Sequence, residues 1–247
     1  MDPRSAANAP FDRTTLPGLF SVVDRLEKAI PLPPHFSESL LKEDDWSFII
    51  KLHALLEASL TMLLAEKLGG AAATPRLREV LSHTEISAQH TGKVALASAL
   101  GILPDNERRF IKRLSWSRND MVHRIEHVAV TLRDYLARLD HNQRRSFASD
   151  IVSLSGPFKA KFGTAATTEI LTNPKRSLWV VGFFILSNIR LRIDALQIER
   201  GFSERDISDV LDELRQVTVD IEQMVNWLNQ LMRAVESSPP SHTPFDA

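Results

Sequence analysis

Three side chains suited to phosphate chemistry lie together in LSWSRNDMVHRIEHV, residues 114–128. Arg118 and Asn119 are adjacent, and His123 follows the arginine by five positions. An arginine stabilises the anionic transition state of phosphodiester cleavage, and a histidine transfers protons near neutral pH. If neutral His123 deprotonates a ribose 2′-hydroxyl, in-line attack leaves a 2′,3′-cyclic phosphate and a free 5′-hydroxyl. This chemistry needs no metal or cofactor, and DNA is inert to it.

Basic residues crowd the same region, with Asp120 as their one acidic counterweight. They are Arg108, Arg109, Lys112, Arg113, Arg118 and Arg124. Such a local patch in a nearly neutral protein is consistent with contacts to an RNA backbone. The alternative interpretation is an ordinary solvated helix face.

One straight helix does not bring the arginine and the histidine together. Positions five apart are separated by about 140° around a regular helix, so Arg118 and His123 do not share a face. Either a helix break near Asn119 turns them together, since asparagine favours caps and turns, or two copies of the chain pool their side chains about a twofold axis.

A second pattern overlaps the first. HRIEH, from His123 to His127, matches H-x-x-E-H, in which two histidines bind zinc and Glu126 acts as base. A third protein ligand at a plausible helical position is not identifiable, so we predict no metal site. His127 then lies at the surface or in an interface, and His53, His83, His90 and His141 are expected to be structural.

The composition is that of an ordinary globular chain. Its 247 residues are 43% hydrophobic and 25% charged, with a net charge of -1 and no cysteine. Disulfides, thiolate metal sites and a cysteine nucleophile are thereby excluded, which fits the cytoplasm. The N-terminus lacks the apolar core of a signal peptide, and the apolar run at 178–186 is shorter than the roughly 20 residues of a spanning helix. We therefore expect no membrane contact.

The elements that must position these side chains all have helical patterns. Residues 1–35 are a proline-rich lead-in with room for a short helix around 18–29. An apolar stripe predicts a helix over 44–68, ended by Gly69 and Gly70. Short helices are expected within 74–82 and 92–102, another begins after Pro104, and a second long helix is expected from about 120 to 139.

The C-terminal half is helical by the same criteria. Residues 177–202 are apolar enough at their start to be internal, and they break at Gly201. Ser203 and Asp206 have capping-box-like spacing. A heptad pattern follows at Ile207, Val210, Leu214, Val217, Ile221, Met224, Leu228 and Leu231. This pattern suits either a coiled coil or an amphipathic helix within a bundle. Residues 237–247 are expected to be disordered, and the fold class is all-α.

At this point the chain resembles a known family. The six residues R-N-x-x-x-H at 118–123 match the motif of the higher eukaryotes and prokaryotes nucleotide-binding (HEPN) superfamily. The stretches DDWSFIIKLHALLEASLTMLLAEKL and TGKVALASALGILPDNERRFIKRLSWSRNDMVH resemble its mannitol operon repressor-like branch. The similarity covers about residues 44–127.

The resemblance implies a helical bundle that dimerises so that motif residues of both protomers line one cleft. It implies a metal-independent ribonuclease of a toxin–antitoxin or phage-defence system, with an antitoxin or defence-complex partner. His123 is then the general base or acid, Arg118 the phosphate clamp and Asn119 the positioning group, while Glu57 orients Arg118 or is structural. The alternative is a non-catalytic dimeric regulator or interaction subunit with the same fold.

The expected organisation has four parts. The lead-in at 1–35 precedes a HEPN-like helical domain at 36–145, and a C-terminal helical extension at 146–236 precedes the tail at 237–247.

Overall fold

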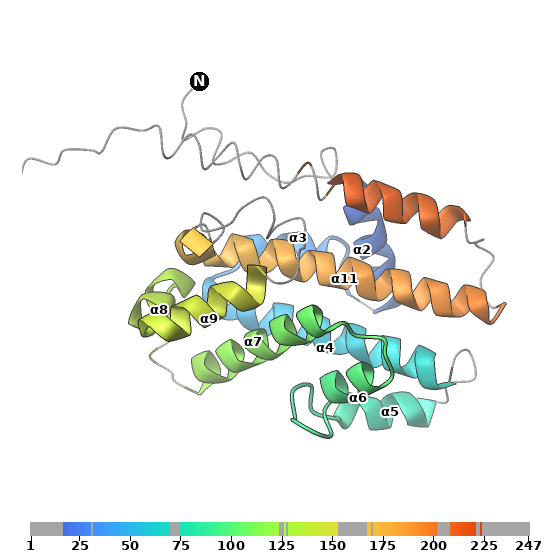
Figure 1. Ribbon diagram of the computed structural model, residues 1–247, viewed down its shortest axis with the longest axis horizontal. Helices are drawn as coiled ribbons and strands as arrows, with labels where there is room; N and C mark the ends of the chain where they lie inside the picture. Colours follow the sequence, from blue (N-terminus) through green and yellow to red (C-terminus); the bar gives the residue numbers. More distant parts are fainter. Residues whose placement is uncertain are drawn as a thin grey trace, which may run out of the picture.

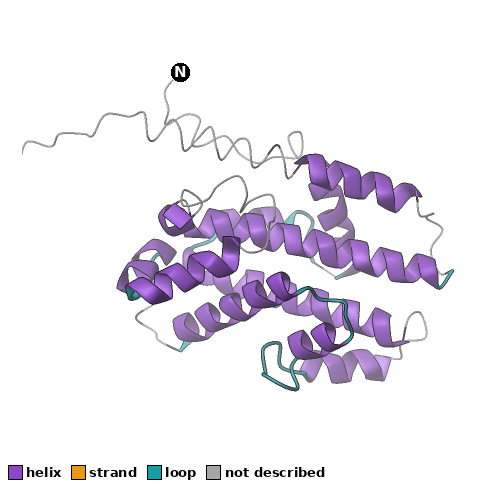
Figure 2. Cartoon of the chain, viewed as in Figure 1, coloured by secondary structure: helices purple, strands orange, loops and turns teal. Residues whose placement is uncertain are grey.

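The computed structural model describes residues 17–30, 32–69, 75–123, 126, 128–152, 167–168, 170–201, 208–220 and 223. Every regular element in these ranges is a helix (Figure 2), which confirms the all-α class. The helices are α2 (Pro17–Ala29), α3 (Phe36–Ser39), the 3-10 turn η1 (Leu40–Lys42), α4 (Asp45–Gly69), α5 (Pro75–His83), α6 (Lys93–Ala99), α7 (Asp105–Val122), α8 (Leu132–Arg138), α9 (His141–Val152) and α11 (Pro174–Glu199). Residues 208–220 form a further helical segment.

Helices α4 and α11 form the centre of the bundle, although about a hundred residues separate them in sequence (Figure 1). Both carry long rows of fully buried aliphatic and aromatic side chains. Gly182 of α11 lies against Leu52 of α4, so closely that a Cβ at position 182 would stand 2.9 Å from Cδ1 of the leucine. The missing side chain therefore lets the two helices approach.

The other helices pack around this pair. Helix α2 lies along α11, while α5, α6 and α7 lie against α4. Trp179 of α11 stacks on Phe183, with ring centroids 4.6 Å apart, and its indole Nε1 donates to the carbonyl of Ser37, 2.8 Å away. Helix α9 lies beside α7, where Asp150 accepts from Nε of Arg113 at 2.7 Å.

The prediction of one long helix from about 120 to 139 is wrong. Helix α7 ends at Val122, and α8 begins only at Leu132. Thr131 is the N-cap of α8, with an extended backbone and a side chain that accepts from the N–H of Asp134. The carboxylate of Asp45 accepts from the N–H of Leu132 at 2.7 Å. These caps satisfy helix-end donors, so a new helix starts where the apolar spacing alone predicted continuation.

The helical segment at 208–220 covers α2. Its Asp220 is buried and accepts from the N–H of Leu19 at 2.8 Å, and Glu213 forms an ion pair with Arg25. Val210 and Val217 of the predicted heptad pattern are buried, whereas Leu214 is 40% exposed. The remaining heptad positions, the Ser203–Asp206 cap and the tail at 237–247 lie outside the described residues.

The expected domain boundaries do not coincide with breaks in the packing. Position 145 falls inside α9, and α2 of the expected lead-in contributes Leu19, Val22 and Leu26 to the buried core. Side chains of α11 join the same hydrophobic cluster as those of α4. Within the described residues, the region 36–145 and its C-terminal extension therefore share one core.

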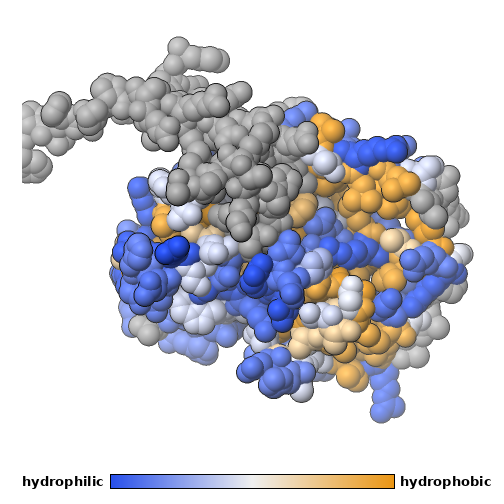
Figure 3. All heavy atoms as spheres, viewed as in Figure 1, coloured by the Kyte–Doolittle hydropathy of each residue, from blue (hydrophilic) through white to orange (hydrophobic). Residues whose placement is uncertain are grey.

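Helix α4, rather than the run at 178–186, is long and apolar enough to cross a membrane by length and composition. In this structure 61% of its most apolar 18-residue window is buried by neighbouring helices, as in the central helix of a bundle. Figure 3 shows that hydrophilic residues cover much of one face, while apolar residues gather toward the right of the view. Leu68, Leu211 and Val219 are among the exposed large apolar side chains.

Candidate functional site at the end of helix α7

Helix α7 carries the predicted motif, and both of its ends are fixed. Pro104 is its N-cap, and Glu107 of its first turn is buried in a bidentate pair with Arg192 of α11, at 2.6 and 2.7 Å. At the other end, Nε1 of Trp46 donates to the carbonyl of Met121 at 3.3 Å, satisfying one of the last carbonyls of the helix. The motif residues are thus held on a rigid element.

The helix passes through Asn119 without a break. The N–H of His123 donates to the carbonyl of Asn119 at 3.2 Å, and His123 is the C-cap with α-type backbone angles. The expectation of a break near Asn119 is therefore wrong. Arg118 and His123 keep their separation of about 140° around the helix.

Arg118 lies on the side of α7 that faces α4. Its side chain is half-buried, and Nη1 donates to Oδ1 of Asn119 at 2.9 Å. Its positive charge lowers the pKa of His53, a residue of α4, so the two side chains are electrostatically coupled. Asn119 thus restrains the orientation of the Arg118 side chain.

His53 is buried and contacts α7 through Ser115. Its Nε2 lies 3.1 Å from Oγ of Ser115, and that hydroxyl donates its single proton to the carbonyl of Ile111 at 2.8 Å. Nε2 must therefore carry the proton that bridges the contact. Burial lowers the pKa of His53 most, and Arg118 and Lys93 lower it further, against an opposing effect of Glu57. The surroundings of His53 thus favour its neutral form.

Glu57 pairs with a buried lysine. Nζ of Lys93 lies 2.9 Å from Oε1 of Glu57; the lysine side chain is 1% exposed and that of the glutamate 32%. Nζ is also 3.4 Å from the carbonyl of Ser82. The salt bridge that the structure gives Glu57 is therefore with Lys93, and Glu57 and Arg118 act on the pKa of His53 in opposite directions.

His123 is exposed at the end of α7 and lies on its opposite, solvent-facing side. Arg109, Lys112, Trp116 and His123 fall on that side, since steps of three and four residues return to the same face. One protomer therefore presents the histidine to solvent and directs the arginine toward α4.

Some residues of the predicted basic patch form ion pairs with other described residues, and others do not. Arg108 pairs with Asp105 at 2.9 Å, and Arg113 pairs with Asp150 at 2.7 Å. Asp120 is thus not the only acidic counterweight. Arg109 and Lys112 have no hydrogen-bond or ion-pair partner among the described residues, while Arg124 lies outside them.

The zinc-peptidase pattern begins where α7 ends. Histidines at positions i and i+4 share a face when both lie on one helix, whereas α7 ends at Val122 and His123 is its C-cap. Glu126 is exposed, and His127 lies outside the described residues.

The sequence reading missed part of the polar cluster around Arg118, namely His53, Ser115 and Lys93. His53 was expected to be structural, and Ser115 and Lys93 were not singled out. A signal existed for His53 alone, namely its four-residue spacing from Glu57, which places both on one face of α4.

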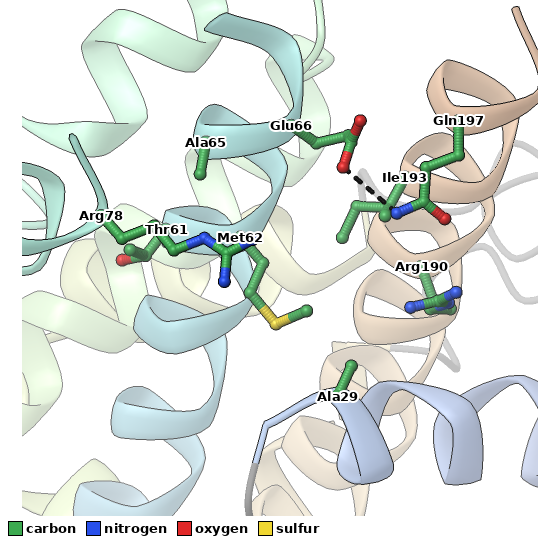
Figure 4. A pocket seen from close by; sticks show the side chains of 9 residues that line it. All are labelled: Ala29, Thr61, Met62, Ala65, Glu66, Arg78, Arg190, Ile193 and Gln197. Atoms are coloured by element: carbon green, nitrogen blue, oxygen red, sulfur yellow. Dashed lines mark hydrogen bonds between the residues drawn. The ribbon is translucent and has the colours of Figure 1, made fainter. Parts of the chain in front are cut away.

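A separate cavity of about 280 Å³ lies between α2, α4, α5 and α11, and Nε2 of Gln197 donates to Glu66 there at 3.1 Å. Figure 4 shows the side chains that line it. Its lining includes Met62, Arg78 and Arg190, and none of the predicted site residues.

A group of potential metal ligands also lies away from the motif. Ligand atoms of Asp24, His35 and Glu38 are within 4.8 Å of one another, and Nδ1 of His35 is 3.3 Å from Oε1 of Glu38. This group is remote in sequence from α7 and takes no part in the site described above.

Comparison with protein-family models, with curated proteins and with solved structures finds no match to this chain. Function is therefore inferred from the residues and geometry of the chain itself.

Proposed function

We propose that the protein is a metal-independent endoribonuclease of HEPN type that acts as a homodimer on cytoplasmic RNA, as a toxin or phage-defence effector. The observation that carries this proposal is the arrangement at the end of α7. There, the exposed imidazole of His123 follows a half-buried Arg118 that is hydrogen-bonded to Asn119. Proton transfer by His123 and phosphate stabilisation by Arg118 then come from side chains that each protomer holds at the end of its helix α7.

The proposed reaction is a transesterification within the RNA. Neutral His123 accepts the proton of a ribose 2′-hydroxyl while the 2′-oxygen attacks the adjacent phosphorus. The bond from phosphorus to the 5′-oxygen breaks, and that oxygen leaves with a proton from solvent. Arg118 stabilises the additional negative charge on the phosphate oxygens. The products carry a 2′,3′-cyclic phosphate and a 5′-hydroxyl.

The proposal requires a dimer, because Arg118 and His123 lie on different sides of an unbroken helix. A twofold axis near the end of α7 would pair the arginine of one protomer with the imidazole of the other. Each of the two sites would then take its residues from both chains.

A second candidate is a non-catalytic dimeric regulator or interaction subunit with the same fold. Its supporting observation is that Arg118 lies beside a satisfied polar cluster of His53, Ser115, Glu57 and Lys93. Such a cluster can serve packing specificity alone, without chemistry. An antitoxin or a defence-complex subunit would be the partner.

The test is incubation of mixed cellular RNA with purified protein in excess chelator, followed by identification of product ends. The variants are His123→Ala and the matched control His90→Ala, which removes an exposed histidine from the segment between α5 and α6. The proposal expects cyclic-phosphate ends from wild type and His90→Ala, and at least about a hundredfold slower cleavage by His123→Ala. Equal cleavage by His123→Ala, or loss of cleavage in chelator, would overturn it. Absence of cleavage by a folded wild-type dimer would favour the second candidate.

A further inference from the structure

The solvent-facing side of α7, which we call the α7 platform, consists of Arg109, Lys112, Arg113, Trp116 and His123. At about 100° per residue these positions fall within an arc of about 100° around the helix. Asp120 lies within the same arc. The platform therefore combines an aromatic ring, three cations and the proposed catalytic imidazole on one strip of surface.

Trp116 is the aromatic centre of this strip. It is 40% exposed, the largest side chain among the exposed hydrophobic residues of the described chain. The guanidinium carbon of Arg113 lies 5.4 Å from its ring centroid, and the ring of Tyr135 lies 6.5 Å away. These neighbours fix the orientation of the indole while it stays accessible. An oriented, accessible aromatic ring is the feature on which an unpaired base stacks.

Among the described residues, one of the three cationic side chains near the Trp116 ring forms an ion pair and two do not. Asp150 accepts from Arg113 and the hydroxyl of Ser146 accepts from its Nη2, at 2.7 and 2.6 Å, which orders that side chain against α9. Arg109 and Lys112 have no ion-pair partner among the described residues, and they lie about two turns and one turn N-terminal to Trp116, respectively. The uncommitted charge next to the indole is therefore positive, as a phosphate backbone requires.

We propose that the α7 platform binds an unpaired RNA strand, with a base stacked on Trp116 and phosphates on Arg109 and Lys112. Single-stranded character follows from the ring, because bases in a duplex are already stacked on one another and unavailable to an indole. A sequence-tolerant interaction is expected, since every base has a face that can stack. This inference rests on the proposed ribonuclease function and gives it a substrate class.

The α7 platform also includes the proposed catalytic residue His123 at its C-terminal end. Trp116 and His123 are seven residues apart, which corresponds to about 10 Å along the helix axis. Stacked nucleotides advance by about 3.4 Å each, so this distance spans roughly three nucleotides. A base held on Trp116 thus leaves a ribose a few nucleotides away at the imidazole.

The test uses a fluorescein-labelled, mixed-sequence single strand of 2′-O-methyl RNA, whose blocked 2′-oxygen prevents cleavage. Affinity is measured by fluorescence anisotropy over a range of salt concentrations, with the corresponding duplex as competitor. Trp116→Ala should weaken binding about 5- to 150-fold, the equivalent of the roughly 1–3 kcal/mol of one base–aromatic stack. Trp116→Phe should retain most of the affinity.

The charge variants separate backbone contacts from stacking. Arg109→Ala and Lys112→Ala should each lower the slope of log affinity against log salt by about 0.7. Arg76→Ala and Arg78→Ala are matched controls, since both arginines are exposed on α5 and lack ion-pair partners among the described residues. These controls should leave the affinity and the slope unchanged.

Wild-type affinity in a folded Trp116→Ala variant, or preference for the duplex, would overturn the inference. Dissociation of a wild-type dimer by Trp116→Ala would do so too, because the indole would then be an interface between protein chains. The two proposals fail separately. Binding as described without any cleavage by wild type removes the ribonuclease and keeps the platform, whereas cleavage with unchanged KM in Trp116→Ala removes the platform and keeps the ribonuclease.

Discussion

His53 is the buried titratable residue on which the polar cluster between α4 and α7 depends. Its burial and the nearby positive charges of Arg118 and Lys93 favour a neutral imidazole, against an opposing effect of Glu57. Protonation would place a third positive charge among these groups. Protein stability should therefore respond to pH at this residue.

The pKa of His53 is lowered from its ordinary value of 6.5, chiefly by burial. Below pH 6.5 the unfolded chain binds a proton at His53 more readily than the folded chain does. The contribution of His53 to the free energy of unfolding therefore has its full value above pH 6.5 and decreases as the pH falls toward the folded-state pKa. In denaturant unfolding between about pH 7.5 and 5, wild type should lose up to about 1.4 kcal/mol per pH unit more than His53→Gln. A constant difference between the two proteins over this range would contradict the assignment.

The Glu57–Lys93 pair gives a second prediction at the residue scale. Glu57→Gln leaves an ammonium that is 1% exposed without its anion, whereas Lys93→Met leaves a carboxylate that is 32% exposed and can be hydrated. Glu57→Gln should therefore be the more destabilising change, by about 1–3 kcal/mol in unfolding free energy. Urea midpoints of the two variants measure this, and the reverse order would show that Lys93 is solvated in solution.

Residue types and spacing led to the prediction that Arg118, Asn119 and His123 form the site, but they did not identify the neighbours of these side chains. The link between His53 and Ser115 joins residues 62 positions apart, and no local pattern encodes such a contact. The same limit applies to Arg113, whose ion pair with Asp150 spans 37 positions. Counting the charged residues near the motif in sequence therefore overestimated the positive charge that is not in ion pairs.

At the scale of elements, the close contact of α4 and α11 is the feature most open to test. Gly182→Ala places a methyl group 2.9 Å from Cδ1 of Leu52. Overpacking costs about 1–3 kcal/mol, which exceeds or offsets the gain of about 1 kcal/mol from replacing glycine within a helix. The variant should thus be neutral to destabilising in wild type.

The Leu52→Ala background supplies the control. With the leucine tip removed, Gly182→Ala should stabilise by up to about 1 kcal/mol, so a double-mutant cycle gives a coupling of at least about 0.5 kcal/mol. The same effect of Gly182→Ala in both backgrounds would show that the glycine does not set the helix separation.

Helices with a strong apolar stripe were predictable, as the agreement of 44–68 with α4 shows. The failure at 120–139 has a specific cause. In the sequence, Val122, Ile125, Val128 and Leu132 keep a helical spacing of three to four residues. However, Asp45 and Thr131 cap a new helix at Leu132. Asp45 is 87 positions away from Leu132. The sequence around the break therefore contains the Thr131 cap but not the Asp45 cap.

At the scale of the whole molecule, the division of the chain at position 145 could not be corrected from sequence. The sequence of α11 shows which residues are apolar, but it does not show which helices these residues pack against. Only the structure shows that Leu178 and Phe183 share a core with α4 and α2. The C-terminal region is thus part of the scaffold that positions α7, through the pair of Arg192 and Glu107.

The whole-molecule claim is that Arg118 of one protomer acts with His123 of the other. The most direct measurement is RNA cleavage by a mixture of the inactive variants Arg118→Ala and His123→Ala after subunit exchange. Each mixed dimer keeps one site with both groups intact, so about one quarter of wild-type activity should return. A mixture that exchanges subunits yet stays inactive, beside an active wild type, would contradict the shared site.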